Sequence, residues 1–243
     1  AVRTHDKAHI LKYLSPDVEF KDVTDDIICL GVFGPKSRDL LSKLTNEDLS
    51  NENFKFGTSK ILKIGSVNVW TQRLSYVGEL GYELYIDQDK GKEIYDLIIN
   101  TGKDFKLSHC GSHAMDIMRM ESGFLHWGHD ISPEENQYQA GLNFAISFKK
   151  PFNFIGKEQL QKIKDQKLDR RFAMFILKNS EPGNPLLLHE EPIYLNDNII
   201  GKTTSGNYSF NYDKNLSFGY IKSELSNEEL QDKNIYIEIE KKK

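Results

Sequence analysis

The sequence predicts an α+β protein in which a mixed domain is followed by a small C-terminal β-barrel. Two observations carry this expectation. In the first part of the chain, strand-length apolar runs and amphipathic helical stretches occur without the strict alternation that a parallel α/β sheet requires. From about Leu168 onward, short apolar runs alternate with turn clusters of Gly, Pro and Asn, at a spacing typical of a small barrel or sandwich. The 243 residues suffice for two modest domains.

Local residues mark each element of the first part. Gly34-Pro35 ends a near-continuous apolar run, and Pro35 suits the first turn of a helix after it. Gly65-Ser66 joins two strand-like runs as a hairpin, and Gly102 and Gly123 each stop a helix. The expected strands are 26–33, 59–64, 67–74, 82–86 and 142–148. Three helices are expected in this part of the chain. The first starts at Pro35, the second ends at Gly102, and the third runs over 112–121.

The strands of the second part are short, as a small barrel needs. They are expected over 172–177, 193–195, 199–204, 216–221 and 235–239. A stretch rich in Lys and Gln precedes them and predicts a short connecting helix. The predicted organisation is therefore a mixed domain over 1–156, a connecting helix over 157–167 and a β-barrel domain over 168–243.

Composition excludes several classes of protein. The formal charge is −4 and the isoelectric point about 6.0, which argues against nucleic-acid binding because a basic surface is lacking. No apolar run approaches the roughly 20 residues that span a bilayer, so no integral membrane protein is expected. Two cysteines are too few for a secreted disulfide scaffold and favour a reducing compartment, the cytoplasm.

Both ends of the sequence look like internal positions of a longer chain. The first residue is not Met, and no secretory pattern follows it. The last residues follow an alternating run over 235–240 that reads as a strand in progress. The expectation is a piece of a larger protein.

The stretch from Leu74 to Ile86 is the most informative one. Two glycines flank Glu79, so the backbone can make an unusual turn before a strand begins. On that strand Glu83 alternates away from the apolar positions, which places its carboxylate on the other face. The pattern alone favours a hairpin with solvated glutamates. A fixed carboxylate also suits a ligand with two parallel N–H donors, such as an aminopyrimidinone ring, and Tyr76 could stack or donate beside it.

A second informative stretch is a helix end followed by a loop. Asp116 and Arg119 are three residues apart and could pair on the helix surface. After Gly123 the loop gathers His126, Trp127, His129 and Asp130, a concentration more typical of a site than of a connector.

The histidines also raise the question of a metal site. His109 and His113 lie four residues apart, and His126, His129 and Asp130 form a second group. Neither spacing matches an established zinc or iron pattern, and a site needs three or four convergent ligands. No metal site is expected.

Together these stretches resemble the folate-binding aminomethyltransferase family, the glycine cleavage T-proteins and their relatives. The family block S-Y-x-G-E-x-G-Y-E is matched by residues 75–83, and its R-x-E-x-G helix end by Arg119, Glu121 and Gly123. Further matches, in chain order, lie at 126–134, 140–142, 154–158, 201–206 and 219–220. The blocks run from about Leu30 to Ile221, so the resemblance covers most of the chain.

The resemblance implies a ferredoxin-like, T-protein-like mixed domain, N-terminally incomplete here, with a C-terminal barrel. It implies transfer of a one-carbon (aminomethyl) unit onto tetrahydrofolate, giving 5,10-methylenetetrahydrofolate. By motif position, Glu83 would hold the donor edge of the pterin with Tyr76 beside it. Arg119, Trp127 and Asp130 would be further folate-binding candidates. The family's catalytic aspartate belongs to a segment ahead of Ala1, so no catalytic residue is assigned.

One branch of the family is matched more finely. Residues 22–25, 34–39 and 44–50 are similar to the C-terminal folate domain of dimethylglycine and sarcosine dehydrogenases and oxidases. Met115 stands where glycine cleavage T-proteins typically carry a substrate-binding Arg, which weakens a plain T-protein assignment.

The resemblance leaves three functions open, and each implies its own partners. A T-protein-like transferase would take its unit from a small-molecule amine or a lipoyl carrier protein. A folate-receiving module would work with an upstream flavin domain. The third function is non-catalytic folate binding.

Overall fold

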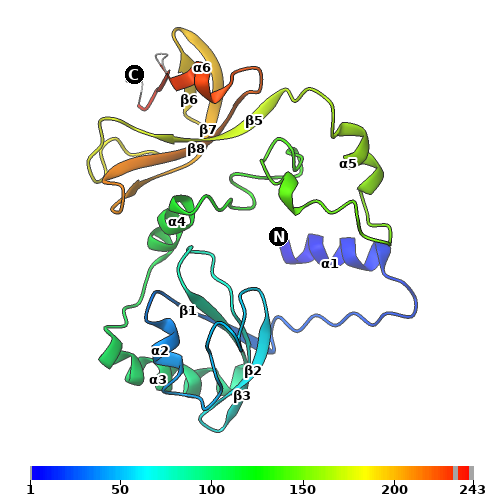
Figure 1. The fold of residues 1–243 in the computed structure, drawn as a ribbon, viewed down its shortest axis with the longest axis vertical. Coiled ribbons are helices and arrows are strands. Elements are labelled where there is room, and N and C mark those ends of the chain that lie inside the picture. Colours follow the sequence, from blue (N-terminus) through cyan, green and yellow to red (C-terminus); the bar gives the residue numbers. More distant parts are fainter. Residues whose placement is uncertain (1, 232–234, 241–243) are drawn as a thin grey trace. The chain divides into compact units, whose positions relative to one another are not determined.

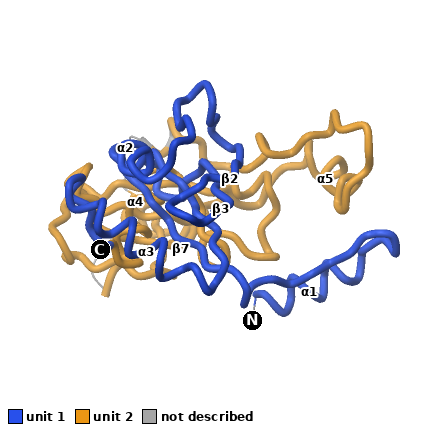
Figure 2. Tube along the Cα trace, turned by 90° about the horizontal axis from the view of Figure 1, so that it is seen from below, with its two compact units in different colours: residues 1–109 blue, residues 110–243 orange. Residues whose placement is uncertain are grey.

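The structure is a computed structural model that describes residues 2–231 and 235–240. The chain divides by its contacts into two compact units, Ala1–His109 and Cys110–Lys243, shown in two colours in Figure 2. The predicted domains over 1–156 and 168–243 are a different division, since a domain is a part of the chain that folds by itself. That division stays a prediction.

Unit 1 contains a four-stranded antiparallel sheet in the order β1-β4-β3-β2. Strands β1, β2 and β3 are labelled in Figure 1. Its helices are α1 (Val2–Tyr13), α2 (Ser37–Leu41) and α3 (Gly91–Gly102), with short 3-10 turns η1 (Gln88–Lys90) and η2 (Lys103–Phe105). Its strands are β1 (Ile27–Phe33), β2 (Ser59–Ile64), β3 (Val67–Gln72) and β4 (Gly81–Asp87).

Alternation along the strands gives this sheet one buried face and one outer face. Tyr82, Leu84 and Ile86 of β4 are fully buried, in a cluster with side chains of α2 and α3. The amphipathic α3 contributes Ile94 and Ile98 to that core. The outer face carries the residues between them, which are half-buried or exposed. The candidate site lies on that outer face.

Unit 2 contains a five-stranded antiparallel sheet in the order β5-β8-β7-β6-β9. Its helices and turn are α4 (Ser112–Glu121), η3 (Asn143–Ala145), α5 (Lys157–Ile163) and α6 (Asn227–Gln231). Its strands are β5 (Arg170–Ile176), β6 (Pro192–Leu195), β7 (Asn198–Ser209), β8 (Lys214–Lys222) and β9 (Ile235–Ile237). Helix α4 packs on β8, where Ile117 and Met120 meet Leu216 and Phe218.

The predicted α+β class is confirmed, and the strands of both sheets lie where apolar runs predicted them. The strand expected over 142–148 is wrong. Ala145 N donates to Leu142 O at 3.0 Å and Ile146 N to Asn143 O at 3.1 Å, so the backbone turns and bonds locally as η3. Phe144 is 82% exposed there, so its apolar character does not reflect burial.

Helix α1 has no counterpart among the predicted elements. None of its residues is buried, and it carries no apolar stripe that could have indicated it. Arg3 ties it to the following segment through Asp22 and Asp25, at 3.0 Å in each case. Helix α5 lies inside the segment 157–167, where a connecting helix was expected.

Among residues 2–231 and 235–240, no helix is both long and apolar enough to cross a bilayer. The same described residues contain no group of three His, Cys, Asp or Glu side chains able to hold a metal ion.

Candidate ligand-binding site

Glu83 projects from the middle of β4 onto the outer face of the unit 1 sheet. Its strand neighbours Tyr82 and Leu84 are fully buried, so the alternation predicted from the sequence is confirmed. Across the sheet, Glu83 lies opposite Gly31 of β1 and Gln72 of β3. The carboxylate therefore sits in the interior of the sheet face, with strands on both sides.

Tyr85 holds one oxygen of this carboxylate. Its hydroxyl donates to Glu83 Oε2 at 2.7 Å, from two residues along the same face. The indole of Trp70, opposite Tyr85 on β3, packs against the phenol ring with centroids 4.8 Å apart. The hydrogen bond to Glu83 and then burial raise the pKa of Tyr85 above its usual value, so the phenol stays protonated.

Cys29 completes the row across the three strands, opposite Tyr85 on β1. Partial desolvation of the thiol and then the negative charge of Glu83 raise the pKa of Cys29, against an opposing hydrogen bond with Tyr85. A thiol with a raised pKa is a weak nucleophile at neutral pH, so Cys29 is a neighbour of the site and no catalytic candidate.

Two glycines on the same sheet face as Glu83 make room for the Phe33 ring. A Cβ at Gly31 would lie 2.6 Å from the Phe33 ring, and one at Gly81 would lie 2.4 Å from it. The ring thus lies over both glycines, and no other side chain fits beneath it. Of the two glycines that flank Glu79, Gly78 has a φ of +74°, as an unusual turn requires. Gly81 is required by packing instead.

Tyr76 lies in the loop between β3 and β4, close in sequence to this face. It is half-buried, and its neighbour Ser75 accepts a hydrogen bond from Val77 N at 3.2 Å. Leu80 O, at the end of the loop, accepts bonds from Gly34 N at 2.8 Å and from Ser37 Oγ at 3.2 Å. These bonds fix the entry of the loop into β4.

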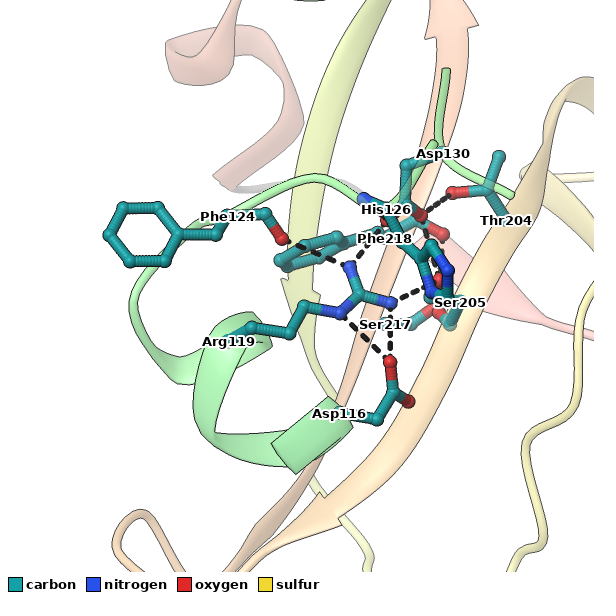
Figure 3. A network of polar contacts seen from close by, with 9 residues as sticks. All are labelled: Asp116, Arg119, Phe124, His126, Asp130, Thr204, Ser205, Ser217 and Phe218. Carbon is teal, nitrogen blue, oxygen red and sulfur yellow. Dashed lines mark hydrogen bonds and ion pairs between the residues drawn. The ribbon is translucent and has the colours of Figure 1, made fainter. Parts of the chain in front are cut away.

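Arg119 of α4 is fully buried, and each of its three guanidinium nitrogens donates a hydrogen bond within the protein (Figure 3). Nε donates to Asp116 Oδ1 at 2.9 Å, and Nη1 to Phe124 O at 3.0 Å and to Asp130 Oδ2. Nη2 donates to Ser205 Oγ and contacts Asp116 Oδ1, both at 2.8 Å. The guanidinium also lies over the Phe218 ring.

Asp130 is equally enclosed. Besides Arg119, its carboxylate accepts from His126 N at 2.9 Å, Thr204 Oγ1 at 2.5 Å and Ser205 Oγ at 2.7 Å (Figure 3). The pair therefore fastens the loop after α4 to strand β7. Every side-chain nitrogen of Arg119 and both carboxylate oxygens of Asp130 are thus bonded within the protein.

The R-x-E-x-G block acquires a structural meaning from these contacts. Gly123 has a φ of +74° and ends α4, with Phe124 N donating to Arg119 O at 2.8 Å. Glu121 accepts from Ser209 Oγ and from Asn211 Nδ2, so a second residue of the block binds the end of β7. The block joins the helix end to the sheet.

The loop that this pair holds exposes its aromatic groups. Trp127 is 55% exposed. The rings of His126 and His129 lie 4.6 Å apart, and His189 lies 6.4 Å from His129. Of the five predicted site residues, Glu83 and Tyr76 lie in unit 1, and Arg119, Trp127 and Asp130 lie in unit 2.

Several functional neighbours were not predicted. Tyr85 and Trp70 adjoin Glu83, and Thr204 and Ser205 adjoin Asp130. Alternation on the strand could have placed Tyr85 beside Glu83, because both occupy the same face two residues apart. Nothing in the sequence separation of 75 residues indicated that Ser205 would meet Asp130.

The comparisons with known proteins agree with this architecture. Residues 1–150 match the GCVT N-terminal domain, and residues 170–243 match the glycine cleavage T-protein C-terminal barrel domain. The human mitochondrial dimethylglycine dehydrogenase is 40% identical over 213 residues, which cover 86% of this chain and 24% of that protein. An aminomethyltransferase of Caldanaerobacter subterraneus is 34% identical over 209 residues, 86% of this chain and 54% of that protein.

A solved structure shares the fold. The glycine cleavage system aminomethyltransferase T from Bartonella henselae has a TM-score of 0.73 at 20% identity, over 89% of this chain and 56% of that one. The chain spans about a quarter of the length of the dehydrogenase and about half that of the transferases. With both domains matched, the chain belongs to the glycine cleavage T-protein family.

Proposed function

We propose that this chain binds tetrahydrofolate and takes part in one-carbon (aminomethyl) transfer onto it, forming 5,10-methylenetetrahydrofolate. The observation that carries the proposal is the Glu83 carboxylate, half-buried on the outer face of the sheet with one oxygen held by Tyr85. Membership of the T-protein family supports it.

The residues around Glu83 fit a pterin ring. Its aminopyrimidinone edge offers two parallel N–H donors, and a carboxylate accepts such a pair in a charge-assisted, bidentate contact. Trp70 and Phe33 supply aromatic surface on the same sheet face as Glu83. Tetrahydrofolate, when bound, supplies the amines that accept the one-carbon unit. This chain's part is to bind and orient the ring.

The other predicted residues divide into two roles. Tyr76 and Trp127 stay proposed folate contacts. Arg119 and Asp130 have their hydrogen-bonding groups filled by the protein, so we propose that they act by positioning the loop that carries Trp127. We assign no catalytic residue.

Titration with tetrahydrofolate or folinic acid tests the binding proposal. Glu83→Gln keeps the shape of the side chain and removes its charge, and we expect a loss of affinity of about tenfold or more, the usual cost of a charge-assisted bond. Glu52→Gln, at an exposed glutamate in a loop of the same unit, is the matched control and should bind as the parent does. Equal affinity of parent and Glu83→Gln would remove Glu83 from the proposed site.

The source of the one-carbon unit has two candidates. A T-protein-like transferase would receive it from a lipoyl carrier protein or another amine donor. A folate module of a flavin-dependent dimethylglycine or sarcosine dehydrogenase would receive it from an upstream flavin domain. The 40% identity to dimethylglycine dehydrogenase, against 34% to the aminomethyltransferase, and Met115 in place of Arg favour the second source.

Two measurements separate these candidates. A Gly-x-Gly-x-x-Gly fingerprint encoded upstream of Ala1 would favour the flavin-dependent enzyme. Methylenetetrahydrofolate formation by the full-length protein, with dimethylglycine, sarcosine or an aminomethylated lipoyl carrier as donor, identifies the source directly. Folate binding with no product from any donor would favour a non-catalytic module.

We also propose a reducing, cytoplasmic setting, since Cys29 and Cys110 are both free thiols.

A further inference from the structure

We propose that Tyr85 is the positioning residue of the folate site: its hydroxyl orients the Glu83 carboxylate, and Trp70 fixes the Tyr85 ring. The inference deepens the proposed function and rests on it. It concerns three side chains on the outer face of one sheet, all in unit 1.

The strand register places these groups in two adjacent rows. One row runs Gly31, Glu83, Gln72 across β1, β4 and β3. The next row runs Cys29, Tyr85, Trp70 across the same strands. Because side chains of one face recur every second residue, Tyr85 stands directly beside Glu83 along β4.

The two oxygens of Glu83 differ in their surroundings. Oε2 accepts the hydroxyl of Tyr85 at 2.7 Å. Oε1 accepts no hydrogen bond from the part of the chain that the structure describes, and the neighbouring position on β1 is a glycine. Tyr85 thus anchors one oxygen, and the other is left without a hydrogen bond from the described residues. This arrangement presents the plane of the carboxylate in a fixed orientation.

Trp70 in turn holds the ring of Tyr85 in place. The Trp70 indole packs on the Tyr85 ring at a centroid distance of 4.8 Å and an interplanar angle of 35°. Tyrosine has few rotatable bonds, and this contact restricts the one that would swing its hydroxyl away. The order of dependence is therefore Trp70 to Tyr85 to Glu83.

Such an anchor raises affinity by preorganisation. A free glutamate samples several rotamers, and a ligand that binds it must pay the entropy of fixing one. Tyr85→Phe keeps the ring and its contact with Trp70 but loses the hydroxyl. We expect it to weaken tetrahydrofolate binding by about three- to tenfold, within the range for a single hydrogen bond to a charged group.

A double-mutant cycle tests the inference. Dissociation constants of tetrahydrofolate are measured for the parent, Tyr85→Phe, Glu83→Gln and the double variant. If Tyr85 acts through Glu83, its removal has little further effect once Glu83 is Gln. Tyr208→Phe, which removes another hydroxyl donor to a carboxylate, Asp213 in unit 2, is the matched control and should bind as the parent does. Independent, additive losses from Tyr85→Phe and Glu83→Gln would overturn the positioning role.

A ligand-free measurement separates failure of this inference from failure of the proposed function. Tyrosinate absorbance at about pH 11 is compared between each protein and its Tyr85→Phe counterpart, since a free tyrosine titrates near pH 10. Tyr85 should add less tyrosinate in the parent background than in the Glu83→Gln background, because burial raises its pKa in both and the bond to the carboxylate raises it further only in the parent. If the parent binds no tetrahydrofolate but shows this difference, the proposed folate binding is wrong and the contact of Tyr85 with Glu83 is right. The same tyrosinate increment in both backgrounds refutes the contact of Tyr85 with Glu83.

Discussion

Arg119 donates from Nη1 to Oδ2 of Asp130, eleven residues further along the chain, and both side chains are sealed from solvent. The bond closes the loop after α4 into a fixed turn, while Ser205 links the pair to strand β7. The arginine of the R-x-E-x-G block, Arg119, is thus a buried residue that joins the loop after α4 to strand β7.

Breaking this pair should destabilise the protein strongly. Arg119→Met keeps most of the apolar volume but leaves the Asp130 carboxylate buried without its cation. We expect a fall in the free energy of unfolding of about 3–5 kcal/mol. Urea denaturation measures it. Lys92→Met, which removes an exposed ion pair with Asp96 on α3, should leave the midpoint nearly unchanged. Equal effects of the two substitutions would refute the fastening role.

Adding a methyl group at Gly81, beside the proposed site, should destabilise the protein more than adding one at Gly111. A Cβ at Gly81 would meet the Phe33 ring at 2.4 Å and Ser75 Cβ at 2.9 Å, so Gly81→Ala should cost about 1–3 kcal/mol of unfolding free energy. Gly111→Ala is the comparison, because no atom lies within 4 Å of its added Cβ and its φ is −79°. Thermal or urea unfolding should show the smaller loss for Gly111→Ala; the reverse order would contradict the packing argument.

Trp127 should matter for binding and little for stability. Its side chain is more than half exposed, so Trp127→Ala should leave the free energy of unfolding within about 0.5 kcal/mol of the parent's. As a proposed folate contact its loss should weaken tetrahydrofolate binding about two- to tenfold, the range of a stacking contact. Calorimetry provides both numbers for the same preparation. Unchanged affinity would remove Trp127 from the proposed contacts.

The sequence alone could predict what depends on local alternation. Glu83 lies on the other face of the sheet from Tyr82, Leu84 and Ile86 of the same strand. This placement follows from a period of two residues, and the structure confirms it. The interior position of Arg119 could not be predicted this way, since its partners Asp130 and Ser205 are 11 and 86 residues distant. Its pairing with Asp116, three residues away, was the local option, and the structure contains that bond too.

The misplaced strand over 142–148 has the same origin. Apolar residues in a short run indicate burial only when a neighbouring strand or helix covers them, and the sequence does not show what covers what. There the turn of η3 satisfies the backbone within the segment, and Phe144 stays exposed.

The central claim is that tetrahydrofolate lies over Glu83 on the outer face of the sheet, and Cys29 reports on it directly. Cys29 is exposed and stands opposite Tyr85, in the row beside Glu83. In a Cys110→Ser protein, which leaves one thiol, the rate of Cys29 alkylation is measured with and without ligand. At about ten times the dissociation constant about nine-tenths of the protein is occupied, so the rate should fall about tenfold. Calorimetric binding of tetrahydrofolate with no change in that rate would contradict the claim.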